Sequence, residues 1–356
     1  MNIHPHQRPD GIALIIAVIA VLVLSALAAG FALSMKVESR LAFNANSATQ
    51  MYWLGRSGVE LARWVLIQER CPYDSLNQIW AGGPGSDCET NGPLAGFSLN
   101  NFHVGDGTVS IKIIDLERKL NINNANAQVI QQALTLMGVD ADDISVVSDS
   151  IQDWVQPGDL PRVAGAKDDY YQGLDPPYHC KEAAIDDLSE LLLVRGVTPE
   201  IYWGGSATNH ALATFQHKLG LGNAPGEAAS YPFGLADVFT PISNGRVNIN
   251  TADKNVLQVL LDDQSGEIAD SIIKSRAGPD GVDGTEDDTP IVNLQQLAAA
   301  GVSPQVISQL GNYCGTRSAT FEVHVTAQIG TQSREYIAVL WRNTATDIRV
   351  VSFYWK

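Results

Sequence analysis

The chain begins with a long stretch in which apolar residues follow one another without interruption by charge. Residues 12–35 are 24 positions with no charged side chain. As a helix rising about 1.5 Å per residue, this stretch is long enough to cross a hydrocarbon layer of about 30 Å. A cleaved secretory signal fits less well, because its apolar part usually has about 7 to 15 residues and a small-x-small site follows it. The pattern therefore predicts a membrane-spanning helix.

The few charges before this stretch predict its orientation. Arg8 and Asp10 are the only fixed side-chain charges there, and they follow the charged amino terminus. Short, positively charged flanks tend to stay in the cytoplasm. We therefore expect a single-pass protein whose C-terminal part is exported.

A helical pattern continues beyond the apolar stretch. No proline occurs from Lys36 to Gln68, and apolar residues such as Leu41, Ala45 and Val59 recur at steps that suit one helical face. Gly55 and Gly58 would weaken the helix locally or allow a neighbour to approach closely. The simplest prediction is one helix from Ile12 to about Gln68, apolar all round in its first half and amphipathic in its second.

Strand patterns lie on both sides of a helical region of about 200 residues. The alternating, β-branched runs are 108–115, 320–329, 334–341 and 348–355. We expect them to form one antiparallel sheet packed on the long helix. The region between the first and second runs has helical patterns punctuated by Pro and Gly, so the sequence predicts an α+β fold with a large, mainly helical domain inserted between strands.

The inserted region contains an internal echo. Residues 120–125 (LNINNA) resemble residues 247–252 (VNINTA). Residues 187–191 and 196–199 likewise parallel residues 293–297 and 301–304. The insert is therefore expected to contain two related helical units. Asn123 or Asn124 and Thr251 are candidate N-caps, because their side-chain oxygens can accept hydrogen bonds from free first-turn amides.

Charge and chemistry narrow the function classes. A net charge of −16 and a pI near 4.7 argue against a nucleic-acid-binding surface, which needs clustered Lys and Arg. No nucleophile constellation emerges, and we do not expect an enzyme. Ser206 lacks the G-x-S-x-G elbow, and four histidines stand in unrelated contexts, where we expect surface or hydrogen-bonded core roles: His179, His210, His217 and His324.

The four cysteines contain no CxxC pair, which disfavours a zinc site. In an oxidising compartment two disulfides are expected. Cys71 with Cys88 would close a short loop and Cys180 with Cys314 a long one. Three pairings are possible, and four buried free thiols are the alternative.

An acidic loop offers hard oxygen ligands. Residues 277–290 (AGPDGVDGTEDDTP) carry five carboxylates: Asp280, Asp283, Glu286, Asp287 and Asp288. Such ligands on a glycine-bent loop suit calcium, although the spacing is not that of an EF-hand. A solvated acidic turn is one alternative. A different metal site at Asp153, Asp159, Asp168 and Asp169 is another, with Gln156 standing where an acidic residue would strengthen it.

An ordered set of motifs resembles the protein K family of type II secretion systems over nearly the whole chain. The set consists of Gly11 before the apolar helix, Asp153-Trp154, Pro161-Arg162, residues 165–171 (GAKDDYY), Pro176-Pro177-Tyr178, residues 189–191 and 194–196, and the Asn-Ile-Asn-Thr-Ala motif of 248–252. Ile16 occupies position five of the mature chain, where most pilins and pseudopilins have glutamate and protein K typically does not.

The resemblance implies a minor pseudopilin that works as a structural component. A prepilin peptidase would cut between Gly11 and Ile12, leaving a methylated N-terminus. The protein would sit in the bacterial inner membrane, with membrane lipid around its anchor before assembly and its C-terminal domain in the periplasm. It would then cap the tip of the pseudopilus, initiating or limiting assembly for export of folded proteins, with I- and J-type minor pseudopilins and the inner-membrane assembly platform as partners. The family is also known to bind calcium, which favours the acidic loop.

The same resemblance divides the chain into five parts: a leader (1–11), a membrane and filament-core helix (12–35), a pseudopilin helix with first strands (36–115), the two-unit insert (116–316) and the last strands (317–356). Two other functions remain open. Residues 247–252 and 272–276 also resemble helix-hairpin-helix DNA receptors, but the acidic hairpin 262–267 would repel phosphate. A tip minor pilin of a type IV pilus is the second.

Overall fold

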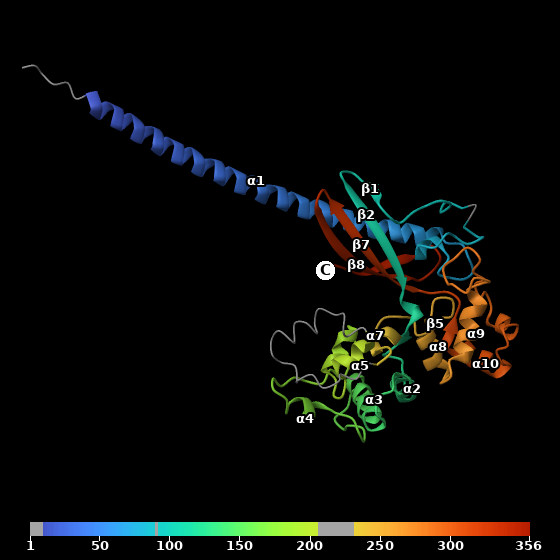
Figure 1. Cartoon of the computed structure of the whole chain (residues 1–356). Coiled ribbons are helices and arrows are strands. Elements are labelled where there is room, and N and C mark those ends of the chain that lie inside the picture. Colours follow the sequence, from blue (N-terminus) through green and yellow to red (C-terminus); the bar gives the residue numbers. More distant parts are fainter. Residues whose placement is uncertain (1–9, 90–91, 206–230) are drawn as a thin grey trace, which may run out of the picture.

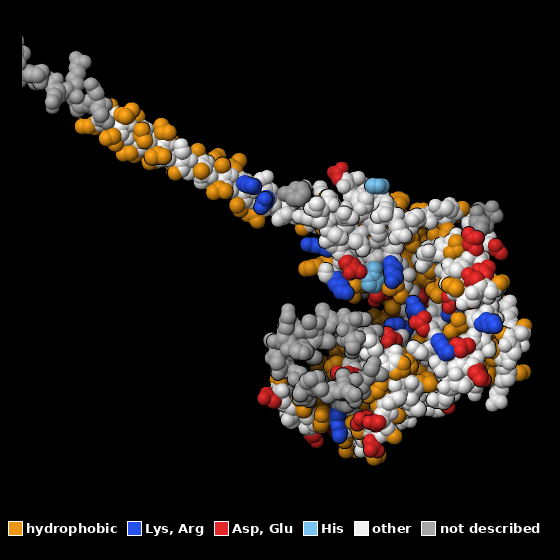
Figure 2. Space-filling model, viewed as in Figure 1, with side chains coloured by type: hydrophobic (Ala, Val, Ile, Leu, Met, Phe, Trp, Pro, Cys, Tyr) orange, Lys and Arg blue, Asp and Glu red, His pale blue; other side chains and the backbone are white. Residues whose placement is uncertain are grey.

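The computed structural model of the chain describes residues 10–89, 92–205 and 231–356 (Figure 1). Its first element, α1 (Asp10–Gln68), is one continuous helix of 59 residues, as the sequence predicts. The apolar half of α1 projects away from the rest of the molecule, and hydrophobic side chains cover its visible face (Figures 1 and 2). Its most apolar 18-residue window has a mean hydropathy of 3.1 and no buried residue. Within the described residues it is the one helix long and apolar enough to cross a membrane.

The second half of α1 packs on a sheet through its two glycines. A Cβ atom on Gly55 would lie 2.5 Å from the Tyr336 ring, and one on Gly58 would lie 2.4 Å from Cγ1 of Val325. Both distances are far shorter than a normal contact, so only glycine lets the helix approach the strands this closely. The predicted close approach at Gly55 and Gly58 is confirmed.

The sheet has five antiparallel strands in the order β1-β2-β7-β8-β9. Their bounds are Phe102–Val104 (β1), Gly107–Asp115 (β2), Thr320–Ile329 (β7), Gln332–Arg342 (β8) and Ile348–Trp355 (β9). The four predicted strands form and pair as expected, and β1 adds a short edge. Alternate residues of β2 are buried against α1, including Val109, Ile111 and Ile113, which join one apolar core with Val65 and Leu66 of the helix.

The helical insert lies between β2 and β7 in the chain and builds a second apolar core from residues between Ile122 and Cys314. Its α-helices are α2 (Ala127–Met137), α3 (Ala141–Val155), α4 (Asp168–Tyr171), α5 (Pro199–Trp203), α7 (Leu235–Val238), α8 (Lys254–Leu261), α9 (Glu267–Arg276) and α10 (Pro304–Tyr313). Figure 1 shows these helices below the sheet, while the apolar half of α1 points away from them.

Short elements lie between these helices and strands. They are the 3-10 turns η1 (Ile79–Ala81), η2 (Leu116–Arg118), η3 (Leu188–Leu193) and η5 (Leu294–Ala298), with the parallel pairs β3 (Leu120–Asn121) to β4 (Phe239–Thr240) and β5 (Val247–Asn248) to β6 (Cys314–Gly315). Each echo motif therefore begins as a two-residue strand and leads into a helix.

The predicted N-caps are wrong. Asn126 caps α2 by accepting from the Val129 amide, and Asp253 occupies the N-cap position of α8. The side chains predicted as caps have other partners. The Asn123 amide group donates to the Ile185 carbonyl and accepts from the Ile185 backbone N–H, and the Thr251 hydroxyl donates to Asp115.

Candidate functional site

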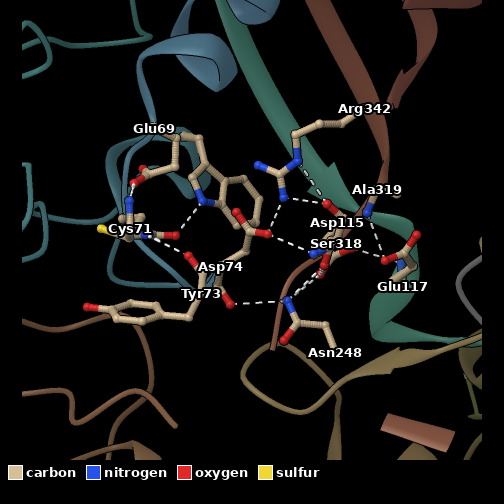
Figure 3. A network of polar contacts seen from close by, with 12 residues as sticks. Glu69, Cys71, Tyr73, Asp74, Asp115, Glu117, Asn248, Ser318, Ala319 and Arg342 are labelled. Atoms are coloured by element: carbon tan, nitrogen blue, oxygen red, sulfur yellow. Dashed lines mark hydrogen bonds and ion pairs between the residues drawn. The ribbon is translucent and has the colours of Figure 1, made fainter. Parts of the chain in front are cut away.

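A buried polar network joins the insert to the sheet, and Figure 3 shows it from close by. Asp115, the last residue of β2, is its centre. Oδ2 of Asp115 accepts hydrogen bonds from Nδ2 of Asn248 at 3.1 Å, Oγ1 of Thr251 at 2.6 Å and Oγ of Ser318 at 2.6 Å. Burial raises the pKa of Asp115, and the negative charge of Asp74 adds to the effect, while these hydrogen bonds oppose it.

A buried ion pair between Asp74 and Arg342 forms the second part of the network. The Arg342 guanidinium contacts Oδ2 of Asp74, and Nε of Arg342 donates to the Ser318 carbonyl at 3.0 Å. The Ser318 amide donates to the same Asp74 oxygen at 2.7 Å, while Nδ2 of Asn248 reaches the Asp74 carbonyl at 3.1 Å. Because Asp74 follows α1 closely, the insert is fastened near the end of α1 that is opposite the apolar half.

Glu117 completes the network just beyond β2. Its carboxylate accepts from the Ala319 amide at 2.8 Å, the Thr320 hydroxyl at 3.1 Å and the Asn244 amide at 3.4 Å. Burial and the neighbouring Asp115 charge raise its pKa to about 7. We call these residues the junction: Asp74, Asp115, Glu117, Asn248, Thr251, Ser318 and Arg342. Its buried hydrogen bonds and its ion pair connect the insert to the sheet and to the segment that follows α1.

Sequence reasoning found only part of the junction. It singled out Asn248 and Thr251 as members of a repeated motif, but it did not identify Asp74, Asp115, Glu117 or Arg342. One signal was available, since Asp115 is a charged residue that closes an alternating, half-buried run. Such positions are costly to bury without partners, and this cost points to an interaction across the structure.

The structure contains one of the two expected disulfides. Cys71 and Cys88 are bonded, whereas Cys180 and Cys314 are buried free thiols. The expected pairing of Cys180 with Cys314 is therefore wrong. The reason is their placement: Sγ of Cys180 contacts the Asp153 carbonyl at 3.7 Å near the end of α3, while Cys314 starts β6 beside Val247.

Two glutamates lie beside the disulfide. Glu69 accepts a hydrogen bond from the Cys71 amide at 2.8 Å, and Glu89 accepts from the Ser86 amide at 2.8 Å. Burial, together with a hydrogen bond shared with Glu89, raises the pKa of Glu69 to about 8. Glu69, Cys71 and Cys88 lie close enough together to resemble a metal site, but the two sulfur atoms are already bonded to each other.

The acidic loop makes many internal contacts. Nε and Nη2 of Arg276 bind both carboxylate oxygens of Asp283, at 3.0 and 2.7 Å, and Nη1 of Arg276 contacts the Ile249 carbonyl. Asp287 accepts from the Asp280 amide at 3.0 Å, and Asp288 accepts from the Gly284 amide at 2.8 Å. Glu286 is exposed. Among the described residues, no three carboxylates of this loop lie close enough together to bind one ion.

The charge of the loop is only partly compensated. Burial raises the pKa of Asp288, and the nearby charge of Asp283 also raises it. Gly278, Gly281 and Gly284 all have positive φ angles, of 69°, 71° and 90°, which bend the backbone as a ligand loop requires. The residues thus supply suitable oxygen atoms for calcium, but they would have to move to surround an ion.

The alternative acidic region does not form a metal site among the described residues. Asp153 is buried and accepts from the Arg162 amide at 2.9 Å. Asp168 accepts from the Cys180 amide at 2.7 Å and pairs with Nδ1 of His179 at 2.8 Å. Asp159 and Asp169 are exposed, and Gln156 binds the Arg162 guanidinium at 2.7 Å. These contacts use the carboxylates separately.

In the hairpin between α8 and α9, the Asp263 carboxylate occupies the backbone amides that would bind a phosphate in a phosphate-binding turn. The Asp263 carboxylate accepts from the backbone amides of Gly266 at 3.0 Å, Ile268 at 2.9 Å and Ala269 at 3.0 Å. These hydrogen bonds lower the pKa of Asp263 although burial opposes them. The amides that a DNA phosphate would need are therefore occupied by a side chain of the protein itself.

The structure also places some of the other residues that were singled out from the sequence. His324 lies between Glu322 and Glu335, at 2.7 and 2.9 Å, and these hydrogen bonds raise its pKa. Ile16 is 62% exposed on α1, and Gly11 and Ile12 lie in the first turns of that helix. His210, His217, Ser206 and most of the leader lie outside the described residues.

A long N-terminal helix with an exposed apolar first half, and with a second half packed on an antiparallel sheet, defines a pilin-like fold. Comparisons with known proteins agree with this class. A family model described as "Type II secretion system (T2SS), protein K" matches residues 95–203. The crystal structure of the GspK-GspI-GspJ complex from enterotoxigenic Escherichia coli contains a similar chain, with a TM-score of 0.59, 15% sequence identity, and coverage of 88% of this chain and 98% of that one.

Curated relatives carry the same description. The chain is 28% identical to the type II secretion system protein K of Aeromonas hydrophila over 212 residues, and 27% identical to the putative protein K of Escherichia coli over 200 residues. Each match covers 55% of this chain and 61% of the relative. Protein K of Pseudomonas aeruginosa is 23% identical over 360 residues, which cover 96% of this chain and 92% of the relative. These findings confirm the resemblance to the type II secretion system protein K family.

Proposed function

We propose that the protein is a structural minor pseudopilin of a type II secretion system that caps the tip of the periplasmic pseudopilus and initiates or limits its assembly. The observation that carries this proposal is the rigid fixation of a large helical insert near the end of α1 that is opposite the membrane-spanning half. The junction holds the insert through buried hydrogen bonds to Asp115 and Asp74. A bulky domain at this end would obstruct the addition of another subunit above it.

The residue at position five supports a place at the tip. In a pilin-like filament a carboxylate at this position neutralises the terminal ammonium of the subunit above, inside an apolar helix bundle where an unpaired charge is costly. Ile16 has no charge to offer. A subunit at the tip has no subunit above it, so Ile16 carries no penalty there. Cleavage by a prepilin peptidase between Gly11 and Ile12 would create the N-terminus that this arrangement needs.

The same proposal assigns location and partners. α1 anchors the protein in the bacterial inner membrane, in contact with lipid, before the assembly platform extracts it, and the head lies in the periplasm. I- and J-type minor pseudopilins are the proposed partners, because the similar solved chain belongs to a GspK-GspI-GspJ complex. We assign the protein no catalytic activity.

A DNA-binding function receives no support from the hairpin that resembled one. Asp263 fills the backbone amides of the α8–α9 turn, and Asp262 and Glu267 add further negative charge. A type IV pilus function is not favoured by the relatives, whose names refer to type II secretion.

We further propose that a calcium ion binds the acidic loop after a local rearrangement. The supporting observation is the incompletely compensated charge around Asp288 on a backbone bent by three glycines. Calcium accepts six to eight oxygen ligands in flexible geometry, so carboxylates and carbonyls of one loop can serve it.

Co-purification tests the main proposal. Residues 36–356 should elute as one complex with the soluble domains of I- and J-type minor pseudopilins from the same system. A matched sample with Asn100→Ala, whose side chain is exposed and is not part of the junction, should behave identically. Failure of the heads to associate at micromolar concentration, with each head folded, would contradict the proposal.

A further inference from the structure

A cavity opens between helices of the insert. It has a volume of about 360 Å³, within the range of about 300–1,000 Å³ typical of small-molecule sites. Helix α2 forms one wall, and the end of α8 together with α10 forms the other. The cavity is distinct from the junction and from the acidic loop, because it shares no lining residue with either.

Side-chain amides dominate the polar lining of this cavity. Gln128 and Gln132 come from α2, and Gln309 and Asn312 come from α10. Within the described part of the chain, none of these four side chains makes a hydrogen bond. Each amide offers two N–H donors and one carbonyl acceptor, so together they present a dense, uncharged set of hydrogen-bonding groups from both walls.

Apolar groups form the remainder of the lining. Val129, Leu260 and Leu261 are half-buried and belong to the insert core or pack against it. Tyr313, the last residue of α10, lines the cavity while its side chain remains 54% exposed. An exposed tyrosine ring offers an apolar face and a hydroxyl group to a ligand at the same time.

The charge of the cavity restricts its ligands. Asp262 is the one charged residue in the lining, although the whole chain has a net charge of −16. Phosphorylated or acidic ligands need Arg or Lys groups, and none lines this cavity. A cationic ligand would find more carboxylates on many other surfaces of the protein.

The usual forms of peptide recognition also fit poorly. β-Strand addition needs a free strand edge, an amphipathic helix needs a mainly apolar groove, and a polyproline segment needs several aromatic walls. This cavity is lined mostly by helical side chains and contains a single aromatic ring. A ligand rich in hydroxyl groups, with apolar C–H faces and no charge, matches both the amides and Tyr313.

We propose that this cavity binds a neutral oligosaccharide. The amides of α2 and α10 bond its hydroxyl groups, and the Tyr313 ring packs on the C–H face of one sugar. Helices α2 and α10 thereby act as the two walls of one saccharide site.

Ligand-observed NMR and calorimetry test the site with the full chain in a detergent that contains no sugar headgroup. The probes are the tetramers of N-acetylglucosamine and of glucose, with an uncharged tetrapeptide in parallel. We expect saturable binding of at least one tetrasaccharide. Tyr313→Ala and Gln309→Leu should each weaken it about tenfold, the effect of losing roughly 1.4 kcal/mol. Gln305→Leu, on an exposed position of the same helix outside the cavity, should leave the affinity unchanged.

Three results would overturn the proposal: no saturable binding of either tetrasaccharide, equal affinities in the cavity variants and Gln305→Leu, or binding of the tetrapeptide alone. Thermal melting of each variant separates loss of binding from loss of folding. All three substituted side chains are exposed, so the melting temperatures should match that of the unmodified protein.

Discussion

Nδ2 of Asn248 lies 3.1 Å from Oδ2 of Asp115, although 133 positions separate the two residues in the chain. The same amide group also reaches the Asp74 carbonyl and the Ser318 hydroxyl, at 3.1 and 2.8 Å. One side chain of the insert thus bonds the end of β2, the segment after α1 and the entry into β7. This makes Asn248 the residue on which the attachment of the insert depends most directly.

Replacing Asn248 should therefore destabilise the protein strongly. Asn248→Ala removes a hydrogen-bond donor from the buried Asp115 carboxylate and from the Asp74 carbonyl. We therefore expect a loss of about 2–4 kcal/mol in the free energy of unfolding. Urea unfolding of residues 36–356 measures this loss. Asn100→Ala is the control and should change the free energy by less than about 0.5 kcal/mol. Equal stability of the two variants would show that the junction contributes little.

Stability should fall as the pH rises through neutrality. The folded-state pKa of Glu117 is raised from 4.5 to about 7, so the folded protein binds more protons than the unfolded one between these values. The contribution of this group is therefore fully present below pH 4.5 and is lost as the pH rises to about 7, with an upper limit of roughly 3 kcal/mol. Glu69, with a pKa raised from 4.5 to about 8, also lowers the stability as the pH rises, over a wider pH range.

Urea unfolding of the head at several pH values between 5 and 8 tests this dependence. Glu117→Gln removes one of the carboxyl groups whose pKa is raised, so the decline in stability should be shallower in the variant but should not vanish. An identical pH profile for both proteins would show that Glu117 is ionised in the folded state as readily as in the unfolded one.

The Ile16 position tests the assembly model separately from stability. Ile16→Glu should leave membrane insertion and leader cleavage largely intact, because the new carboxylate lies close to the cytoplasmic end of the helix. Leu24→Glu, near the middle of the apolar segment, should reduce insertion, since a charge at the centre costs about 2.5–3.5 kcal/mol. Gel mobility after expression with the peptidase reports processing. A clear loss of processing in Ile16→Glu would contradict our interpretation of position five.

Calcium should raise the melting temperature of the head if it binds the acidic loop. At a calcium concentration one hundred times Kd the gain is about 2.7 kcal/mol, which corresponds to several degrees. Melting with calcium and with a chelator measures it. Asp288→Asn should abolish most of the difference, whereas Asp159→Asn should preserve it. The same transition in calcium and in chelator would exclude a structural ion at this loop.

The sequence was most informative where periodic patterns extend over many residues. The long α1 helix, the four main strands and the close approach at Gly55 and Gly58 all follow from local spacing. The junction could not be found in this way, because Asp74 and Arg342 are 268 positions apart and neither side chain shows a local pattern. The N-caps were misplaced for a related reason: Asn123 and Thr251 have tertiary partners that compete with a capping role.

The sequence also could not decide the state of the cysteines or of the acidic loop. A long-range disulfide depends on two Cβ atoms meeting in space, and Cys180 and Cys314 belong to different elements. For the loop, the sequence showed five carboxylates but not that Arg276, from the preceding helix, would bind Asp283 with both arms of its guanidinium. A sequence shows which carboxylates could bind a metal ion, but it does not show which of them are already bound by other side chains.

The chain leaves the sheet at Asp115 and returns to it at Thr320, and Asp115 faces Phe321 in the pairing of β2 with β7. The insert therefore has its entry and exit on neighbouring strands, as an ordinary hairpin loop does. A shortened chain with a tight turn in place of residues 116–319 should accordingly retain the helix and the sheet. The insert can thus be regarded as an exchangeable module on a minimal pilin frame.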